Sequence, residues 1–268
     1  MRSVFRQTLR AYRIGMLAVA AGLFAVSLII VYTFEAFGGL EAFAELFELL
    51  PAPIAALFRA QGGFAATATG YIAADYRHPF YIIAGFAYAI AVASGASARE
   101  IERGTTLMLL AAPIARWRYL LPKLAVLVVG AAVAVFATWL GTFVGAVLTG
   151  ISEEIDYGLL ALVQLNMFAL ILAAGGITAL VSAASSDGGQ AVVWGAGVAT
   201  VMYLLDFLSL IWGPAEPLGP LTLFHYYDPL GVVRSDGVPW RDLTALFGVA
   251  AAGFAAALAT FQRRDIAP

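Results

Sequence analysis

The run LAVLVVGAAVAVFATWLGTFVGAVL, residues 124–148, contains no charged side chain. About 20 such residues in a helix cross the ~30 Å hydrocarbon core of a bilayer. A segment in lipid must satisfy its own backbone hydrogen bonds, and the run lacks the alternation of apolar and polar residues that marks a strand of a membrane barrel. It therefore predicts a transmembrane helix.

The rest of the chain has the same character. Of its 268 residues, 62% are hydrophobic and 12% are charged, and the mean hydropathy is +0.89, whereas soluble domains have roughly 45–50% apolar and ~25% charged residues. The first apolar run is too long for a cleavable signal peptide, so we expect it to remain in the membrane. We predict an all-α protein with one transmembrane domain, residues 1–268, and six spans near 14–34, 79–98, 123–149, 158–182, 190–212 and 243–262.

The basic residues indicate which ends of the spans face the cytoplasm. Of the fifteen, only Arg59, Arg77, Arg234 and Arg241 fall opposite the N-terminus, which leaves eleven on its side. Cytoplasmic loops retain Lys and Arg, so we expect both termini to be cytoplasmic.

The residues before the first span have a basic face. Arg2, Arg6, Arg10 and Arg13 recur at helical spacing, with Phe5, Leu9 and Tyr12 on another side. The pattern predicts an amphipathic interfacial helix over residues 1–13. Positive flanking of the first span is an equally good explanation.

The loop between the second and third spans, REIERGTTLMLLAAPIARWR (residues 99–118), is longer than a plain connection needs. Alternating charges precede a short apolar helix that Thr105 or Thr106 would cap and Pro113 would end. Such a helix, lying along the membrane face with charge on both sides, is suited to docking in a groove of a cytoplasmic partner. The alternative is an interfacial helix that only anchors the loop.

Two motifs resemble those of the ABC-2 type permeases, the membrane subunits of ATP-driven exporters. The first is EIERGTTL (residues 100–107), followed by LAAPIAR (residues 110–116) and Lys123, and the second is FQRRDI (residues 261–266). Six spans and a long first outer loop also agree, so the resemblance covers essentially the whole chain. Thr106 departs from it, because the family often has a charged residue there.

The resemblance implies a role and partners for these segments. Residues 100–116 would form the coupling helix that docks in an ABC ATPase subunit, and residues 1–13 would be the cytoplasmic connecting helix. Two copies of the ATPase, binding ATP and Mg²⁺, would join this chain and a second permease subunit in a homodimer or heterodimer in the cell membrane. The implied coupling residues are Glu100, Glu102, Arg103, Gly104, Thr105, Leu107, Pro113 and Arg116.

Motifs for chemistry within the chain are missing. The sequence has no G-x-x-x-x-G-K-[ST] phosphate loop, no G-x-S-x-G elbow, no cysteine and only two histidines, His78 and His225, in separate loops. We therefore expect no enzyme activity, no cofactor or metal in this chain and no nucleic-acid partner. The stretch SDGGQ (residues 186–190) resembles the end of the ABC ATPase signature, but we interpret it as a turn between two spans.

A few polar residues lie inside the predicted spans. Asp206 is acidic, and such a residue within a membrane is by default a functional hypothesis, although it could also be solvated near the outer end. Gln164 and Asn166 could line a substrate path or hydrogen-bond neighbouring helices. Gly141 and Gly145 form a G-x-x-x-G motif that favours close helix packing but also arises by chance.

These observations favour a permease that forms the path of a hydrophobic or amphiphilic cargo, such as a drug, antibiotic or lipid. The alternative is an ATP-independent channel or secondary carrier, which we would expect to hold several ionisable groups or broken helices at mid-membrane. A membrane-anchored enzyme or assembly subunit is the third hypothesis.

Overall fold

The computed structural model describes residues 1–39, 45, 49–54, 67–102 and 115–264. Within these ranges the chain is helical and contains no strand, which confirms the predicted all-α class. The described α-helices are α1 (Arg2–Ala36), α4 (Ala68–Asp75), α5 (Pro79–Ala96), α6 (Ala98–Glu102), α8 (Trp117–Thr149), α9 (Tyr157–Ala184), α10 (Gly188–Ile211), α11 (Pro229–Ser235) and α12 (Trp240–Arg263), and the 3-10 helices are η1 (Ser152–Glu154), η2 (Gly213–Leu221) and η3 (Phe224–Tyr226).

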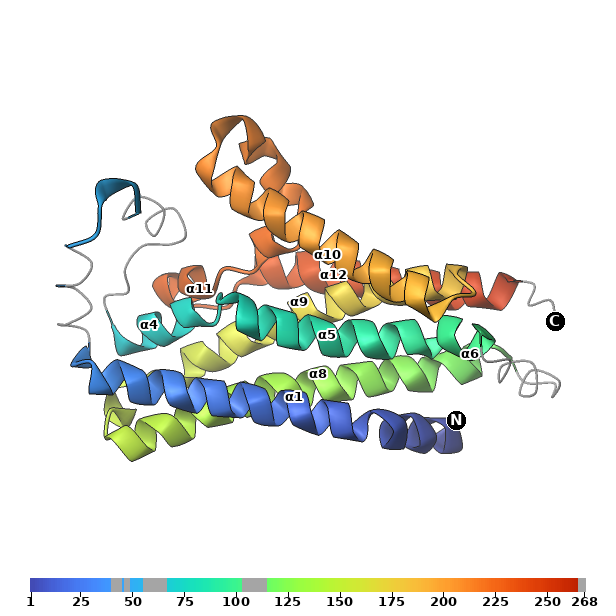
Figure 1. The fold of residues 1–268 in the computed structure, drawn as a ribbon, viewed down its shortest axis with the longest axis horizontal. Helices are drawn as coiled ribbons and strands as arrows, with labels where there is room; N and C mark the ends of the chain where they lie inside the picture. The colour runs from blue at the N-terminus through green and yellow to red at the C-terminus, as the bar shows by residue number, and fades with distance from the viewer. Residues whose placement is uncertain (40–44, 46–48, 55–66, 103–114, 265–268) are drawn as a thin grey trace.

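Six of the described helices are long and apolar enough to cross a membrane: α1, α5, α8, α9, α10 and α12. Each overlaps one predicted span. Figure 1 shows five of them running side by side, while α10 tilts away from the others at one end. The start of α1, α6 and the end of α12 lie together, and we call this the terminal end. The opposite end, with α4 and α11, is the loop end.

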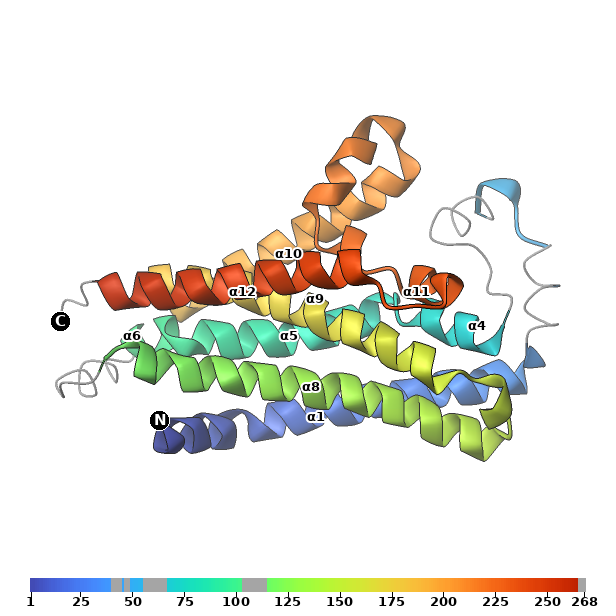
Figure 2. The ribbon, with the colours of Figure 1, turned by 180° about the vertical axis from the view of Figure 1, so that it is seen from behind.

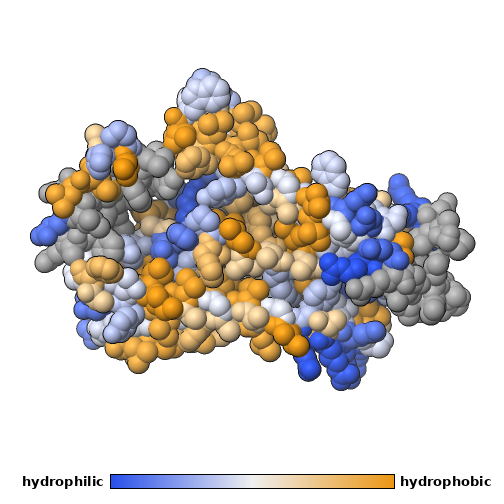
Figure 3. Space-filling view, viewed as in Figure 1, coloured by the Kyte–Doolittle hydropathy of each residue, from blue (hydrophilic) through white to orange (hydrophobic). Residues whose placement is uncertain are grey.

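The first span continues directly from the N-terminal residues. Helix α1 runs without a break from Arg2 to Ala36, which is ~52 Å at 1.5 Å per residue and exceeds the ~30 Å hydrocarbon core. One of its ends must therefore extend beyond the hydrocarbon. Hydrophilic side chains gather at the terminal end in Figure 3, near the start of α1, while apolar ones cover much of the middle. An interfacial position for residues 1–13 stays a prediction.

Glycines allow two pairs of helices to pack closely. A Cβ atom on Gly141 of α8 would clash with the backbone carbonyl of Phe24 in α1, and one on Gly145 would lie 3.0 Å from Val31 Cβ. A Cβ atom on Gly253 of α12 would lie 2.6 Å from the backbone of Gly176 in α9. The G-x-x-x-G motif at Gly141 and Gly145 thus lies at a helix crossing, as small residues do in membranes.

Helix α9 lies at the centre of the bundle. It packs against α5, α8, α10 and α12, and 72% of its most apolar window is buried inside the protein, compared with 17% for α10. The carboxylate of Asp187 accepts hydrogen bonds from Gly189 N at 2.7 Å and Gln190 N at 3.1 Å, capping α10. The turn between α9 and α10 therefore falls at the start of the SDGGQ stretch, as predicted, and the last three residues of the stretch begin α10.

Candidate functional site: the coupling loop and the polar residues of the spans

Three predicted coupling residues lie within the described part of the loop 99–118: Glu100 and Glu102 in α6, and Arg116 just before α8. Arg103, Gly104, Thr105, Leu107 and Pro113 lie outside the described residues. The structure therefore shows how the two ends of the loop meet the spans, at the terminal end of the bundle.

Glu100 pairs with a buried lysine. Lys123 is 2% exposed, and its ammonium donates to the Glu100 carboxylate and to the Ala96 carbonyl oxygen, the latter at 2.9 Å. The same ammonium lies 3.8 Å from the centroid of the Tyr119 ring, a cation–π contact. One charge thus joins the start of the coupling loop to the end of α5 and the start of α8.

Glu102 contacts the beginning of α10. Its Oε2 atom accepts a hydrogen bond from Gly188 N at 3.0 Å, and a carboxylate is favourable at the N-terminal, partly positive end of a helix. A Cβ atom on Gly188 would lie 2.8 Å from Arg99 Cβ, so α6 and α10 approach closely here. Glycine at this position makes the contact possible.

Two serines attach the α5–α6 joint to α9. Ser97 Oγ donates to the Ser182 carbonyl oxygen at 2.8 Å, and Ser182 Oγ donates to the Ser94 carbonyl oxygen at 3.0 Å. The amide of Ala98 in turn donates to Ser182 Oγ at 3.2 Å. All three serines and alanine are buried, so the joint cannot move without disturbing α9.

The second end of the loop is fastened to the end of α12. Arg116 donates to the carbonyl oxygen of Arg264, and Trp117 N donates to Gln262 Oε1 at 3.3 Å. The Arg264 guanidinium donates to the carbonyl oxygens of Ala183 and Ser185, at 3.1 and 2.6 Å, at the end of α9. Arg264 therefore links Arg116 to the end of α12 and to the end of α9.

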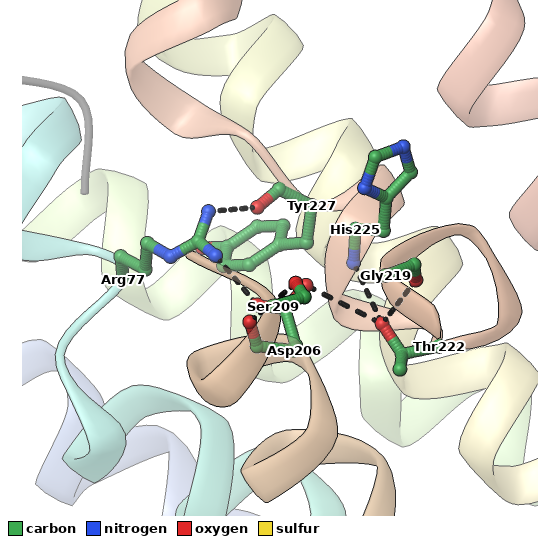
Figure 4. Close-up of polar contacts among 7 residues, drawn as sticks. All are labelled: Arg77, Asp206, Ser209, Gly219, Thr222, His225 and Tyr227. Atoms are coloured by element: carbon green, nitrogen blue, oxygen red, sulfur yellow. Dashed lines mark hydrogen bonds and ion pairs between the residues drawn. The ribbon is translucent and has the colours of Figure 1, made fainter. Parts of the chain in front are cut away.

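Asp206, predicted on a substrate path, is held by a cation (Figure 4). It is 4% exposed, and its Oδ2 atom pairs with Arg77 Nη2 at 2.8 Å while Thr222 Oγ1 donates to Oδ1 at 3.3 Å. Arg77 Nη1 also donates to the Tyr227 carbonyl oxygen at 2.9 Å. The carboxylate thus ties α10 to the corner between α4 and α5 and to the segment 222–227.

Gln164 and Asn166, both predicted on the substrate path, lie on different sides of α9. Two residues are ~200° apart around a helix, so Gln164 and Asn166 point to nearly opposite sides. Asn166 Nδ2 donates to the Tyr226 carbonyl oxygen at 3.0 Å, on the side of the segment 222–227 that Asp206 also contacts. Gln164 lines a groove against α8 instead. The three predicted path residues therefore do not form one site.

Comparison with known families fits this arrangement. The family model described as "ABC-2 family transporter protein" matches residues 16–266. The chain belongs to the ABC-2 transporter family. It is thus a multi-pass membrane protein, a permease that works with an ABC ATPase partner. No curated protein and no solved structure matches it.

Two residues that the sequence predictions did not assign to a site are central to this ABC-2 permease. Lys123 belongs to the first motif, but only the structure shows it to be the counter-ion of Glu100. Arg77 lies 129 positions from Asp206, and a lone basic residue beside Pro79 carries no signal for so distant a partner. Within the described ranges, no group of three or more His, Cys, Asp or Glu could hold a metal ion.

Proposed function

We propose that this permease is the membrane-spanning subunit of an ABC exporter, and that its loop 99–118 couples the spans to the ATPase. The attachment of both loop ends supports this proposal. Glu100 and Glu102 connect the start of the loop to α8 and α10, and Arg116 connects its end to α12 and α9. A loop that only closed a hairpin would not need contacts with four spans.

These contacts suggest how force would pass from the ATPase into the membrane. A partner that bound the loop and displaced it would pull on Lys123, in the second turn of α8, and on Gly188, the first residue of α10. Because helices are stiff and packed interfaces switch between discrete arrangements, the spans would shift as bodies between inward-facing and outward-facing states. ATP binding would favour one state by binding it more tightly.

The complete exporter would contain two ATPase subunits and a second permease subunit, identical or related, in the cell membrane. The terminal end would face the cytoplasm, and ATP and Mg²⁺ would be bound by the ATPases, with no cofactor in this chain. The apolar spans suit a hydrophobic or amphiphilic cargo. An ATP-independent carrier would rely on an available ionisable group inside the spans, and Asp206 is already committed to Arg77.

The test begins with co-expression of the permease and an ABC ATPase encoded beside it, followed by co-purification. Glu102→Ala and Arg116→Ala should each reduce the ATPase activity that depends on the permease, because each removes an attachment of the loop. Glu153→Ala is the matched control and should keep full activity, because Glu153 is exposed and belongs to η1, which contacts α4 at the loop end. Unchanged coupling in both loop variants, with the spans correctly inserted, would refute the coupling role.

A further inference from the structure

The start of α1 carries a row of arginines on its outward side. Helix α1 lies at one edge of the bundle, beside α8 (Figure 2). Val4, Thr8 and Tyr12 face the bundle, because Thr8 is buried and the other two pack against the core. The outward side carries four exposed arginines, Arg2, Arg6, Arg10 and Arg13. None of the four makes an ion pair or a hydrogen bond with a described residue.

The acidic side chains at the terminal end do not compensate this charge. Glu100 accepts a hydrogen bond from Lys123, and Glu102 accepts one from Gly188 N. Asp187 caps the start of α10. Among the described residues, these three are the acids at that end of the bundle. The arginine row is therefore open to an anionic partner.

The sequence of α1 indicates the level of the arginines in the bilayer. Residues 14–34 contain no charged side chain and cover ~31 Å at 1.5 Å per residue, which matches the ~30 Å hydrocarbon core. On the outward side, Ile14 and Leu17 are 74% and 58% exposed, so the arginine row continues as an apolar face suited to lipid. Arg13 thus lies at the edge of the hydrocarbon. Arg10 lies ~4.5 Å beyond it, within a headgroup layer ~5–7 Å deep.

The spacing of Arg10 and Arg13 suits a phosphate group. Residues three apart on a helix are neighbours, and a guanidinium can donate two parallel hydrogen bonds to a phosphate. Arg6 and Arg2 lie ~10 and ~16 Å beyond Arg13, outside the headgroup layer. A protein in the aqueous phase would meet these outer two arginines first, whereas a lipid headgroup would meet the inner two.

We propose that Arg10 and Arg13 bind the headgroup of an anionic phospholipid in the leaflet at the terminal end. The lipid phosphate would pair with the two guanidinium groups, and the acyl chains would lie along the apolar face that begins with Ile14 and Leu17. Clusters of basic residues next to a membrane span are typical of such sites. The contact needs neither the ATPase nor the coupling loop, so it stands or fails separately from the proposed function.

Native mass spectrometry of the full chain, with any subunits that co-purify, measures the lipid preference. The protein in detergent is mixed with equal amounts of phosphatidylglycerol and phosphatidylcholine of the same acyl length, and the bound lipids are identified by mass. The unmodified chain should retain more phosphatidylglycerol. Arg10→Gln/Arg13→Gln should reduce this preference at least about fivefold, the contribution of one basic residue near an anionic lipid surface.

Arg2→Gln/Arg6→Gln is the matched control, because it removes the same charge from the same exposed side of α1. It should keep most of the preference. Equal retention of the two lipids by the unmodified chain, or an equal loss of preference in the two double variants, overturns the proposal. So does loss of a co-purifying ATPase from Arg10→Gln/Arg13→Gln with an unchanged lipid preference, because a protein would then occupy this face.

Discussion

Two ion pairs with a buried member join distant parts of this permease, one at each end of the bundle. Lys123 pairs with Glu100 at the terminal end, and Asp206 pairs with Arg77 towards the loop end. A buried ion pair adds little stability compared with well-packed apolar side chains, but removal of one partner leaves an uncompensated buried charge and is strongly destabilising. The geometry of each pair therefore holds segments together that could otherwise separate.

Arg77→Met should destabilise the protein strongly. Asp206 would lose its counter-charge while it remains 4% exposed, and the loss of one partner from a buried pair costs ~3–5 kcal/mol. The double variant Arg77→Met/Asp206→Asn should recover much of this loss, because no charge remains. Thermal unfolding in detergent measures both, with the exposed Arg234→Met as control. A double variant no more stable than Arg77→Met alone would contradict this account of the pair.

Asp75, at the end of α4, should make the stability of the folded protein depend on pH. Burial raises the pKa of its carboxyl above the ordinary 3.8, against the opposing effects of Tyr81 and His78, and its Oδ2 atom is buried without a hydrogen bond. The folded state thus favours the protonated form, so the contribution of Asp75 to stability is most favourable below pH ~4 and becomes less favourable as the pH rises through the raised pKa. Asp75→Asn should raise the unfolding temperature at neutral pH and lose this advantage near pH ~4. The exposed Asp236→Asn should show neither effect, and an Asp75→Asn gain that persists in acid would point to another cause.

At the level of helices, close packing between α1 and α8 contributes to stability. Gly141→Ala should lower stability by roughly 1–3 kcal/mol, the usual cost of overpacking, because the new methyl group meets the Phe24 backbone and α1 must move. Gly22→Ala, on α1 with no atom within 4 Å of the added Cβ, is the control and should be neutral or stabilising by ~0.5–1 kcal/mol. Thermal unfolding midpoints compare the two, and equal midpoints would show that the crossing can relax.

The elements differ in how far the sequence predicts them. The six apolar runs carry their own signal, because each must bury its backbone bonds within itself, and all six appear as helices. Helix α8 begins at Trp117, before the predicted start at residue 123. Hydropathy misses its first turns because they include Pro122 and Lys123, whose charge is compensated by Glu100. Partners such as Arg77 and Asp206 could not be predicted, because hydropathy contains no information about which helices become neighbours. The predicted coupling residues beyond Glu102 and before Arg116 lie outside the described residues.

The orientation of the whole molecule can be measured directly, because the chain contains no cysteine. Ser3→Cys lies in the first turn of α1, at the terminal end, and Glu153→Cys lies in η1, which contacts α4 at the loop end. Both positions are exposed. A membrane-impermeant maleimide should label Glu153→Cys in intact cells and Ser3→Cys only after permeabilisation, as the distribution of basic residues requires. The reverse pattern would invert the assignment of both ends and would place the loop 99–118 out of reach of a cytoplasmic ATPase.

The start of α1 and the end of α12 lie at the same end of the bundle. A single polypeptide could therefore join two copies head to tail, or join one copy to a soluble domain at either terminus, through a water-exposed linker and without an added span. Such a single-chain version would also fix the subunit ratio, so that a variant could be placed in only one half of a pair.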